Sequence, residues 1–138
     1  MGDLAATPVL DSDVLIDHLR DAGPGRELVD ELATSSGYLI TAVTAFELAL
    51  GRDYAHDPAQ ADALMAVPCL MLTREAAVVG GALLRELRGM GAGIDVRDAM
   101  QAGICLEAGA PLVTRNIRHF SRVPGLRATE PGHWRSAT

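Results

Sequence analysis

The most informative part of the sequence is DVRDAMQAGICLEAGAPLVTRNIRHF, residues 95–120. After Asp98 its first part is apolar on nearly every side, which is typical of a buried helix. The run PLVT, residues 111–114, is apolar without alternation, as expected of a strand covered on both faces. A buried helix that leads into a buried strand favours a parallel sheet with helices on both sides.

The rest of the chain repeats this alternation of short apolar runs and longer helical patterns. Helical patterns begin at Pro24 and Thr73, residue types that favour a first turn and an N-cap. The sequence therefore predicts an α/β fold, with one domain at residues 1–130 and a short tail at residues 131–138. The expected strands cover residues 8–10, 38–41, 69–72, 111–114 and 126–129.

The composition is that of an ordinary globular protein, with 49% hydrophobic and 22% charged residues. No apolar run approaches the roughly 18 residues that a membrane span needs, and no basic segment precedes an apolar one at the N-terminus. We therefore expect a cytoplasmic protein without a membrane segment. Cys69 and Cys105 both lie in apolar segments, so we expect two reduced thiols in the core.

The net charge of −6 is unevenly distributed along the chain. Residues 1–69 carry three arginines and twelve carboxylates, whereas residues 70–138 carry nine arginines and six carboxylates. The chain contains no lysine. An acidic protein is not an obvious partner for nucleic acid, so any such role requires a local basic patch or bound cations.

Four polar side chains fall at the ends or on the faces of apolar elements. Asp11 directly follows the first expected strand, and Asn116 lies two residues after the strand at 111–114. Because ligands bind beyond the carboxyl ends of parallel strands, both side chains are expected at that edge of the sheet. Glu47 interrupts the apolar face of a helical pattern after the second strand, and Asp98 starts the most apolar helix.

Each of these residues alone has a structural explanation: Asp11 can end a strand, Asp98 can cap a helix, and Asn116 can form a turn. Together they are harder to explain, since two carboxylates about 4 Å apart repel by roughly 4 kcal/mol at an effective dielectric of about 20. Such a cluster needs protons or a cation. Oxygen ligands suit Mg²⁺ or Mn²⁺, and the histidines and cysteines have no zinc-like spacing.

Four blocks in order along the chain resemble the PIN-domain ribonucleases, especially the VapC-like toxins of toxin–antitoxin pairs. The blocks are VLDSDVLID, TAVTAFELALG, the stretch at 95–120 and the trailing VPGL. The resemblance implies a three-layer α/β/α sandwich with a central, mostly parallel five-stranded sheet. It also implies a Mg²⁺- or Mn²⁺-dependent endoribonuclease that cleaves single-stranded or loop RNA, commonly tRNA or ribosomal RNA. A cognate antitoxin would block it, and a homodimer could form through residues 74–90 or around Tyr54.

The resemblance assigns metal-binding and catalytic roles residue by residue. The family's three acids fall on Asp11, Glu47 and Asp98, and its fourth acidic position falls on Asn116. These four residues are therefore the expected metal ligands, although Asn116 carries no charge and weakens the case for a second ion.

Further positions beside the site also match the family. Ser12 takes the place of a small hydroxyl residue after the first acid, and Thr114 would line the site. Asp13 stands where the family usually has Asn, Ser or Thr. Either Asp13 or Asp95 could supply the carboxylate that is missing at the fourth position, and the sequence leaves the choice open.

The basic residues Arg115, Arg118 and Arg122, with His119, lie next to the expected site. They fit contacts to phosphate, a solvated helix face, or the docking of an acidic antitoxin segment. An apolar strand followed by Asp-x-Asp also opens haloacid-dehalogenase-type phosphatases, but those rely on a lysine, which this chain lacks. A non-catalytic PIN-like module that binds RNA or protein stays open as the alternative function.

Overall fold

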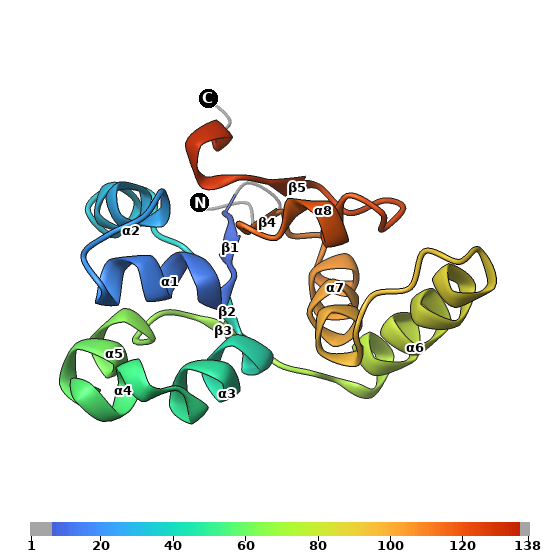
Figure 1. The fold of residues 1–138 in the computed structure, drawn as a ribbon, viewed down its shortest axis with the longest axis horizontal. Helices are drawn as coiled ribbons and strands as arrows, with labels where there is room; N and C mark the ends of the chain where they lie inside the picture. The colour runs from blue at the N-terminus through green and yellow to red at the C-terminus, as the bar shows by residue number, and fades with distance from the viewer. Residues whose placement is uncertain (1–6, 136–138) are drawn as a thin grey trace.

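The computed structural model describes residues 7–135, so residues 1–6 of the expected domain and 136–138 of the expected tail lie outside it. Figure 1 shows short strands in the middle of the molecule with helices on both sides. The strands are β1 (Val9–Leu10), β2 (Ile40–Thr41), β3 (Cys69–Leu70), β4 (Leu112–Val113) and β5 (Ala128–Thr129). The helices are α1 (Ser12–Leu19), α2 (Gly25–Ala33), α3 (Ala42–Leu50), α4 (Arg52–His56), α5 (Pro58–Leu64), α6 (Arg74–Gly89), α7 (Val96–Ala108) and α8 (Ile117–Phe120), followed by a 3₁₀ helix at Pro131–His133.

All strand pairs are parallel, as the apolar runs predict. β1 pairs with β4 and β4 with β5, while β2 pairs with β3. The expectation of one continuous five-stranded sheet is wrong, because the strands form a three-stranded and a two-stranded ladder. The two ladders meet at a parallel bridge between Val9 and Leu39, where the Leu10 N–H donates to the Leu39 carbonyl oxygen over 2.9 Å. Through this bridge the five strands follow the order β3-β2-β1-β4-β5.

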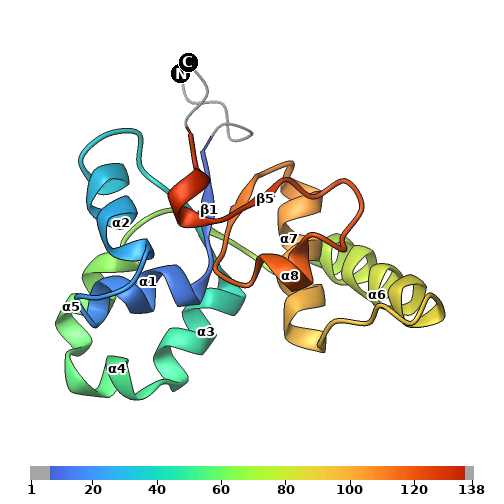
Figure 2. The same ribbon diagram turned by 45° about the horizontal axis from the view of Figure 1, so that its top comes forward.

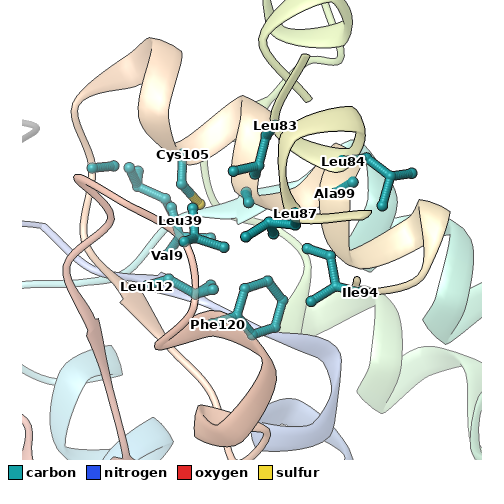
Figure 3. Packing of buried hydrophobic residues seen from close by; sticks show 13 residues of the cluster. Val9, Leu39, Leu83, Leu84, Leu87, Ile94, Ala99, Cys105, Leu112 and Phe120 are labelled. Atoms are coloured by element: carbon teal, nitrogen blue, oxygen red, sulfur yellow. The ribbon is translucent and has the colours of Figure 1, made fainter. Parts of the chain in front are cut away.

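Neighbouring strand residues point to opposite sides of the sheet, and both sides are buried. Val9 and Leu112 pack with residues of α6 and α7 in one apolar cluster, which also contains Phe120 (Figure 3). Leu10 and Val113 pack with residues of α1 and α2 in a second cluster. Figure 2 shows the same division, with α1 to α5 on one side and α6 and α7 on the other. The prediction of a three-layer sandwich is confirmed.

Helices α6 and α7 pack closely through glycine. A Cβ at Gly103 would lie 2.4 Å from the Ala76 carbonyl oxygen, and one at Gly80 would lie 2.7 Å from the Ala99 carbonyl oxygen. Gly80 therefore serves close helix packing. Gly81 has no such neighbour, since a Cβ there would meet nothing within 4 Å.

The expectation of two core thiols is correct for one cysteine. Cys105 is buried, and burial raises its pKa to about 12. Cys69 is exposed, so its assignment to the core is wrong. The reason is its place on β3, which pairs with β2 at the end of the strand order.

The described part of the expected tail lies against the domain. The 3₁₀ helix Pro131–His133 contacts α2, and Trp134 packs against the apolar cluster of α1 and α2. Among residues 7–135, no helix has both the length and the apolar character that crossing a bilayer requires.

Candidate functional site

The strand order creates a topological switch between β1 and β4. From β1 the chain moves outward to β2 and β3, and it then returns to the other side of β1 to form β4. In open parallel sheets, ligands bind at the carboxyl ends of the strands on either side of such a switch. The next residues are Asp11 after β1 and Thr114 after β4, and the Thr114 hydroxyl donates to Asp11 Oδ2 over 2.7 Å.

Asp11 is a buried carboxylate surrounded by hydrogen-bond donors. Its Oδ1 accepts from the Ser12 N–H over 2.9 Å and from Gln101 Nε2 over 3.3 Å. Burial raises the pKa of Asp11, the charge of Asp98 adds to the rise, and the hydrogen bonds from Thr114 and Ser12 oppose it. The ionised form of Asp11 is therefore unfavourable unless positive charge lies nearby.

Two helices bring further carboxylates to this edge of the sheet. α3 starts directly after β2 and carries Glu47, whose side chain is 14% exposed. α7 leads into β4, so its first turn, with the buried Asp98, lies at the carboxyl ends of the strands. The cap of α7 is Asp95, whose Oδ1 accepts from the Asp98 N–H over 2.7 Å. The alternative that Asp98 is merely the cap is therefore wrong.

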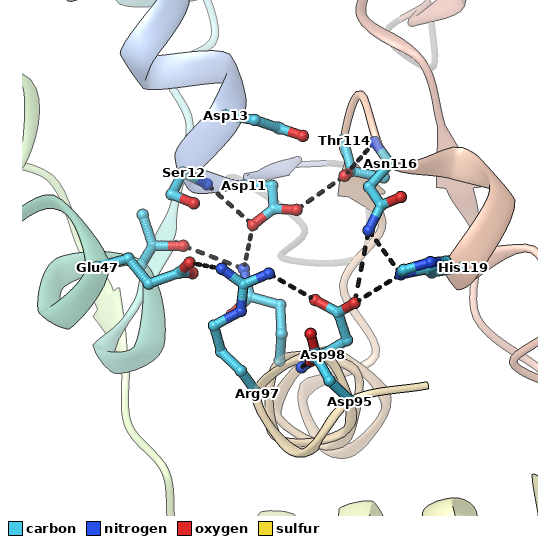
Figure 4. Close-up of polar contacts among 12 residues, drawn as sticks. Asp11, Ser12, Asp13, Glu47, Asp95, Arg97, Asp98, Thr114, Asn116 and His119 are labelled. Atoms are coloured by element: carbon cyan, nitrogen blue, oxygen red, sulfur yellow. Dashed lines mark hydrogen bonds and ion pairs between the residues drawn. The ribbon is translucent and has the colours of Figure 1, made fainter. Parts of the chain in front are cut away.

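The guanidinium of Arg97 lies between these carboxylates (Figure 4). It forms an ion pair with Glu47, and its Nη2 lies 3.2 Å from Asp98 Oδ1. Within residues 7–135, no three Asp, Glu, His or Cys side chains are arranged as they stand to hold a metal ion. Asp11, Glu47 and Asp98 thus converge on one place, but an ion shared by all three has to compete with Arg97 for their oxygens.

Asn116 and His119 approach Asp98 from the segment after β4. His119 Nδ1 lies 3.0 Å from Asp98 Oδ2 and 2.8 Å from Asn116 Nδ2. The Asn116 N–H donates to Thr114 Oγ1 over 3.0 Å, which joins it to the Asp11 side of the site. An amide at this position avoids placing a further carboxylate beside the buried Asp98.

The two candidates for a replacement carboxylate differ in their surroundings. Asp13 accepts from the Arg115 N–H with both oxygens, over 3.1 and 3.3 Å. Burial, followed by the charge of Asp11, raises the pKa of Asp13 to about 7. Asp95 is exposed and already holds the first turn of α7 as its cap. Asp13 is therefore the candidate that interacts with Asp11.

The arginines beside the site also have different surroundings. Arg115 Nη1 lies 2.6 Å from Oδ1 of the buried Asp17, so this residue ties the segment after β4 to α1. Arg122 donates to the Gly93 carbonyl oxygen over 3.3 Å. Arg118 is exposed on α8. A phosphate contact fits Arg118 better than the other two arginines.

Sequence reasoning missed two residues of the site, Gln101 and Arg97. Gln101 is a polar residue among the buried apolar residues of α7, which is the same signal that singles out Glu47 on α3, and this signal could have found it. Arg97 lies fifty positions from Glu47 in the chain, and no local pattern indicates that the two pair.

Comparison with known proteins gives the family. The model of the PIN domain matches residues 9–126. The chain belongs to the PIN domain family. This PIN-domain chain is similar to Ribonuclease VapC19 of Mycobacterium tuberculosis (strain ATCC 25618 / H37Rv), with 30% identity over 120 residues that cover 86% of this chain and 96% of the relative. The resemblance drawn from the four sequence blocks is confirmed.

Solved structures share the fold of this PIN domain. The crystal structure of VapBC2 from Rickettsia felis, bound to a promoter DNA fragment, superposes with a TM-score of 0.76 at 19% identity, over 94% of this chain and 99% of that chain. A toxin–antitoxin complex from Klebsiella pneumoniae superposes with a TM-score of 0.70 at 20% identity, over 91% of this chain and 98% of that chain.

Proposed function

We propose that this PIN-domain protein is a Mg²⁺- or Mn²⁺-dependent endoribonuclease that acts as the toxin of a toxin–antitoxin pair. Its substrate is single-stranded or loop RNA, with tRNA and ribosomal RNA as first candidates, and its place of action is the cytoplasm. The observation that carries the proposal is the meeting of Asp11, Glu47 and Asp98 at the switch between β1 and β4. The similarity to Ribonuclease VapC19 and to a toxin–antitoxin complex supports the same function.

The chemistry of the donor set suits a divalent cation. Asp11 and Asp98 are buried, and the raised pKa of Asp11 means that nearby positive charge favours its ionised form. Arg97 already places one positive charge between Glu47 and Asp98, in keeping with a site for cations. Asp11, Glu47 and Asp98 would hold the ion, and Asn116 would contribute its carbonyl oxygen or orient a water molecule. When bound, such an ion lowers the pKa of a water molecule and neutralises charge on the phosphate.

Other residues of the chain hold these groups and meet the RNA. The Ser12 N–H and the Thr114 hydroxyl bind different oxygens of Asp11, so the carboxylate has a fixed orientation. Arg118 lies exposed on α8 and contacts RNA phosphates through its charge. The side-chain amide of Asn116 donates directly to Asp98 Oδ2 over 3.5 Å, which keeps the two residues next to each other. Water is the attacking group, so no side-chain nucleophile is required.

Cleavage of an RNA pool by the purified protein tests the proposal. We expect EDTA to abolish cleavage and Mn²⁺ to restore it, and we expect Asp11→Asn to stay folded but inactive. Tight RNA binding by the wild type without cleavage would support the non-catalytic alternative. Comparing the RNA fragments that accumulate on expression of the wild type and of Asp11→Asn then identifies the target.

We also propose a cognate antitoxin and a homodimer. The largest exposed apolar side chains include Phe46 and Leu50 on α3, at 67% and 76% exposure. Phe46 borders a groove of about 470 Å³, which is lined by Ala42, Val43, Phe46, Leu72, Val96, Arg97 and Met100. An exposed apolar surface of this kind is typical of a protein–protein contact.

A further inference from the structure

A buried amide lies directly behind the acidic site. Gln101 is 1% exposed and follows Asp98 by one turn on α7. Its Nε2 donates to Asp11 Oδ1 over 3.3 Å and to Thr44 Oγ1 over 3.0 Å, and its Oε1 accepts from the Thr41 hydroxyl. One side chain therefore connects α7, which carries Asp98, to Asp11 after β1 and to the first turn of α3, the helix that carries Glu47.

The partners of Gln101 determine which way its amide points. The ionised carboxylate of Asp11 only accepts hydrogen bonds, so it requires an N–H from the amide. Thr41 Oγ1 accepts the cap hydrogen bond from the Thr44 N–H over 3.1 Å, which leaves its own hydrogen for the Gln101 oxygen. A reversed amide would direct its carbonyl oxygen at the Asp11 carboxylate. The observed orientation satisfies both ends of the amide at once.

We propose that Gln101 is a positioning residue of the metal site, which holds the Asp11 carboxylate and the first turn of α3 in a fixed relation to α7. The inference rests on the proposed function, in which Asp11, Glu47 and Asp98 share a divalent ion. Its physical basis is that a carboxylate oriented by a buried donor loses less conformational freedom when it binds an ion. Residues that orient metal ligands in this way typically change metal affinity by about 10- to 100-fold.

Substitution of Gln101 by methionine tests the proposal. Gln101→Met keeps the side-chain length and the helix propensity but removes both the donors and the acceptor. We expect the affinity for Mn²⁺, measured by calorimetry or by the EPR signal of free Mn²⁺, to fall about 10-fold or more. The matched control is Gln60→Met on α5, the other glutamine of the chain, which should leave the affinity unchanged. Equal affinities of Gln101→Met and the wild type would overturn the proposal.

A double variant separates positioning from general stability. Gln101→Met leaves the buried Thr44 hydroxyl without its donor, so adding Thr44→Val should restore part of the lost stability. The Mn²⁺ affinity of the double variant should stay low, because Asp11 still lacks the amide donor. Affinity that recovers together with stability would mean that Gln101 is merely structural.

A spectrum in EDTA distinguishes failure of this proposal from failure of the proposed function. A wild type that binds no Mn²⁺ would overturn the metal-dependent function itself. The orienting role is then decided by the Ser12 amide, which donates to the same oxygen of Asp11 as Gln101 does. We expect Gln101→Met to shift the ¹H–¹⁵N resonance of Ser12 and Gln60→Met to leave it in place. An unshifted Ser12 resonance in Gln101→Met would remove the orienting role.

Discussion

Asp11 places a charge where burial disfavours it. Because its pKa is raised in the fold, the ionised carboxylate destabilises the protein at neutral pH. Asp11→Asn removes this charge with little change in size. We expect the variant to lose RNA cleavage and Mn²⁺ binding, and yet to have a free energy of unfolding in EDTA at least equal to that of the wild type. Urea denaturation measures this quantity, and a loss of more than about 2 kcal/mol would contradict the prediction.

Asp13 gives the fold a pH dependence. Its pKa is about 7 in the fold, against an ordinary value of 3.8, so between these values the folded protein binds more protons than the unfolded chain. This contribution to stability is present below 3.8 and is lost as the pH rises through about 7, with a ceiling of about 4 kcal/mol. In EDTA, Asp13→Asn should therefore gain stability relative to the wild type as the pH rises from about 4 to about 8. If the difference in unfolding free energy between Asp13→Asn and the wild type does not change with pH, Asp13 is not the source of the pH dependence.

Arg97 stabilises the acidic cluster and competes for its oxygens. With Arg97→Gln in EDTA, we expect the free energy of unfolding to fall by on the order of 1 kcal/mol, since the side chain is half-exposed and its ion pairs are screened. The affinity for Mn²⁺ should rise, because the ion no longer competes with the guanidinium. Arg20→Gln is the matched control, as Arg20 pairs with Asp53 at the opposite end of α1 from Asp11 and is similarly exposed. If Arg97→Gln binds Mn²⁺ no more tightly than the wild type does, the guanidinium of Arg97 does not compete with the ion for the carboxylate oxygens.

At the scale of the elements, the contact between α6 and α7 depends on a missing side chain. A Cβ at Gly103 would lie 2.4 Å from the Ala76 carbonyl oxygen, so Gly103→Ala has to push the helices apart. We expect a loss of about 1–3 kcal/mol in unfolding free energy, measured by urea denaturation. Gly81→Ala adds the same methyl group to α6 in open space and should stabilise by about 0.5–1 kcal/mol. Equal effects of the two substitutions would show that close packing is not the cause.

The elements themselves could largely be predicted from the sequence. Every expected strand occurs. For β1, β2 and β4 the reason is that strands buried on both faces leave continuous apolar runs. Thr73 caps α6, as its residue type indicates. The strands are shorter than the runs, since pairing depends on the neighbouring backbone and not only on apolar character. For the same reason β1 and β2 are joined only by the bridge between Val9 and Leu39, and the strands form two ladders instead of one.

The site could be predicted in part. Asp11 and Thr114 meet because both directly follow parallel strands, which a sequence reveals. The pairing of Arg97 with Glu47 and the reach of Gln101 to Asp11 depend on the relative placement of α3, α7 and β1. No local periodicity carries that information.

At the scale of the whole molecule, the apolar surface on α3 predicts an interface. If a second copy covers it, Phe46→Asp should convert the dimer to a monomer, because a buried carboxylate without a partner opposes association. Val78→Asp is the matched control, since Val78 on α6 is 65% exposed and Phe46 is 67% exposed. Light scattering coupled to size-exclusion chromatography measures the mass. If Val78→Asp is a monomer and Phe46→Asp stays a dimer, the interface lies on α6 and not on α3.

The order of the strands has a consequence for the synthesis of the protein. β4 lies between β1 and β5, so the first strand gains this neighbour only after residues 112–113 have been translated. A nascent chain that ends before α7 contains Asp11 and Glu47 but neither Asp98 nor β4. With the proposed activity, the toxin therefore stays harmless to the ribosome that makes it until its last strands have emerged.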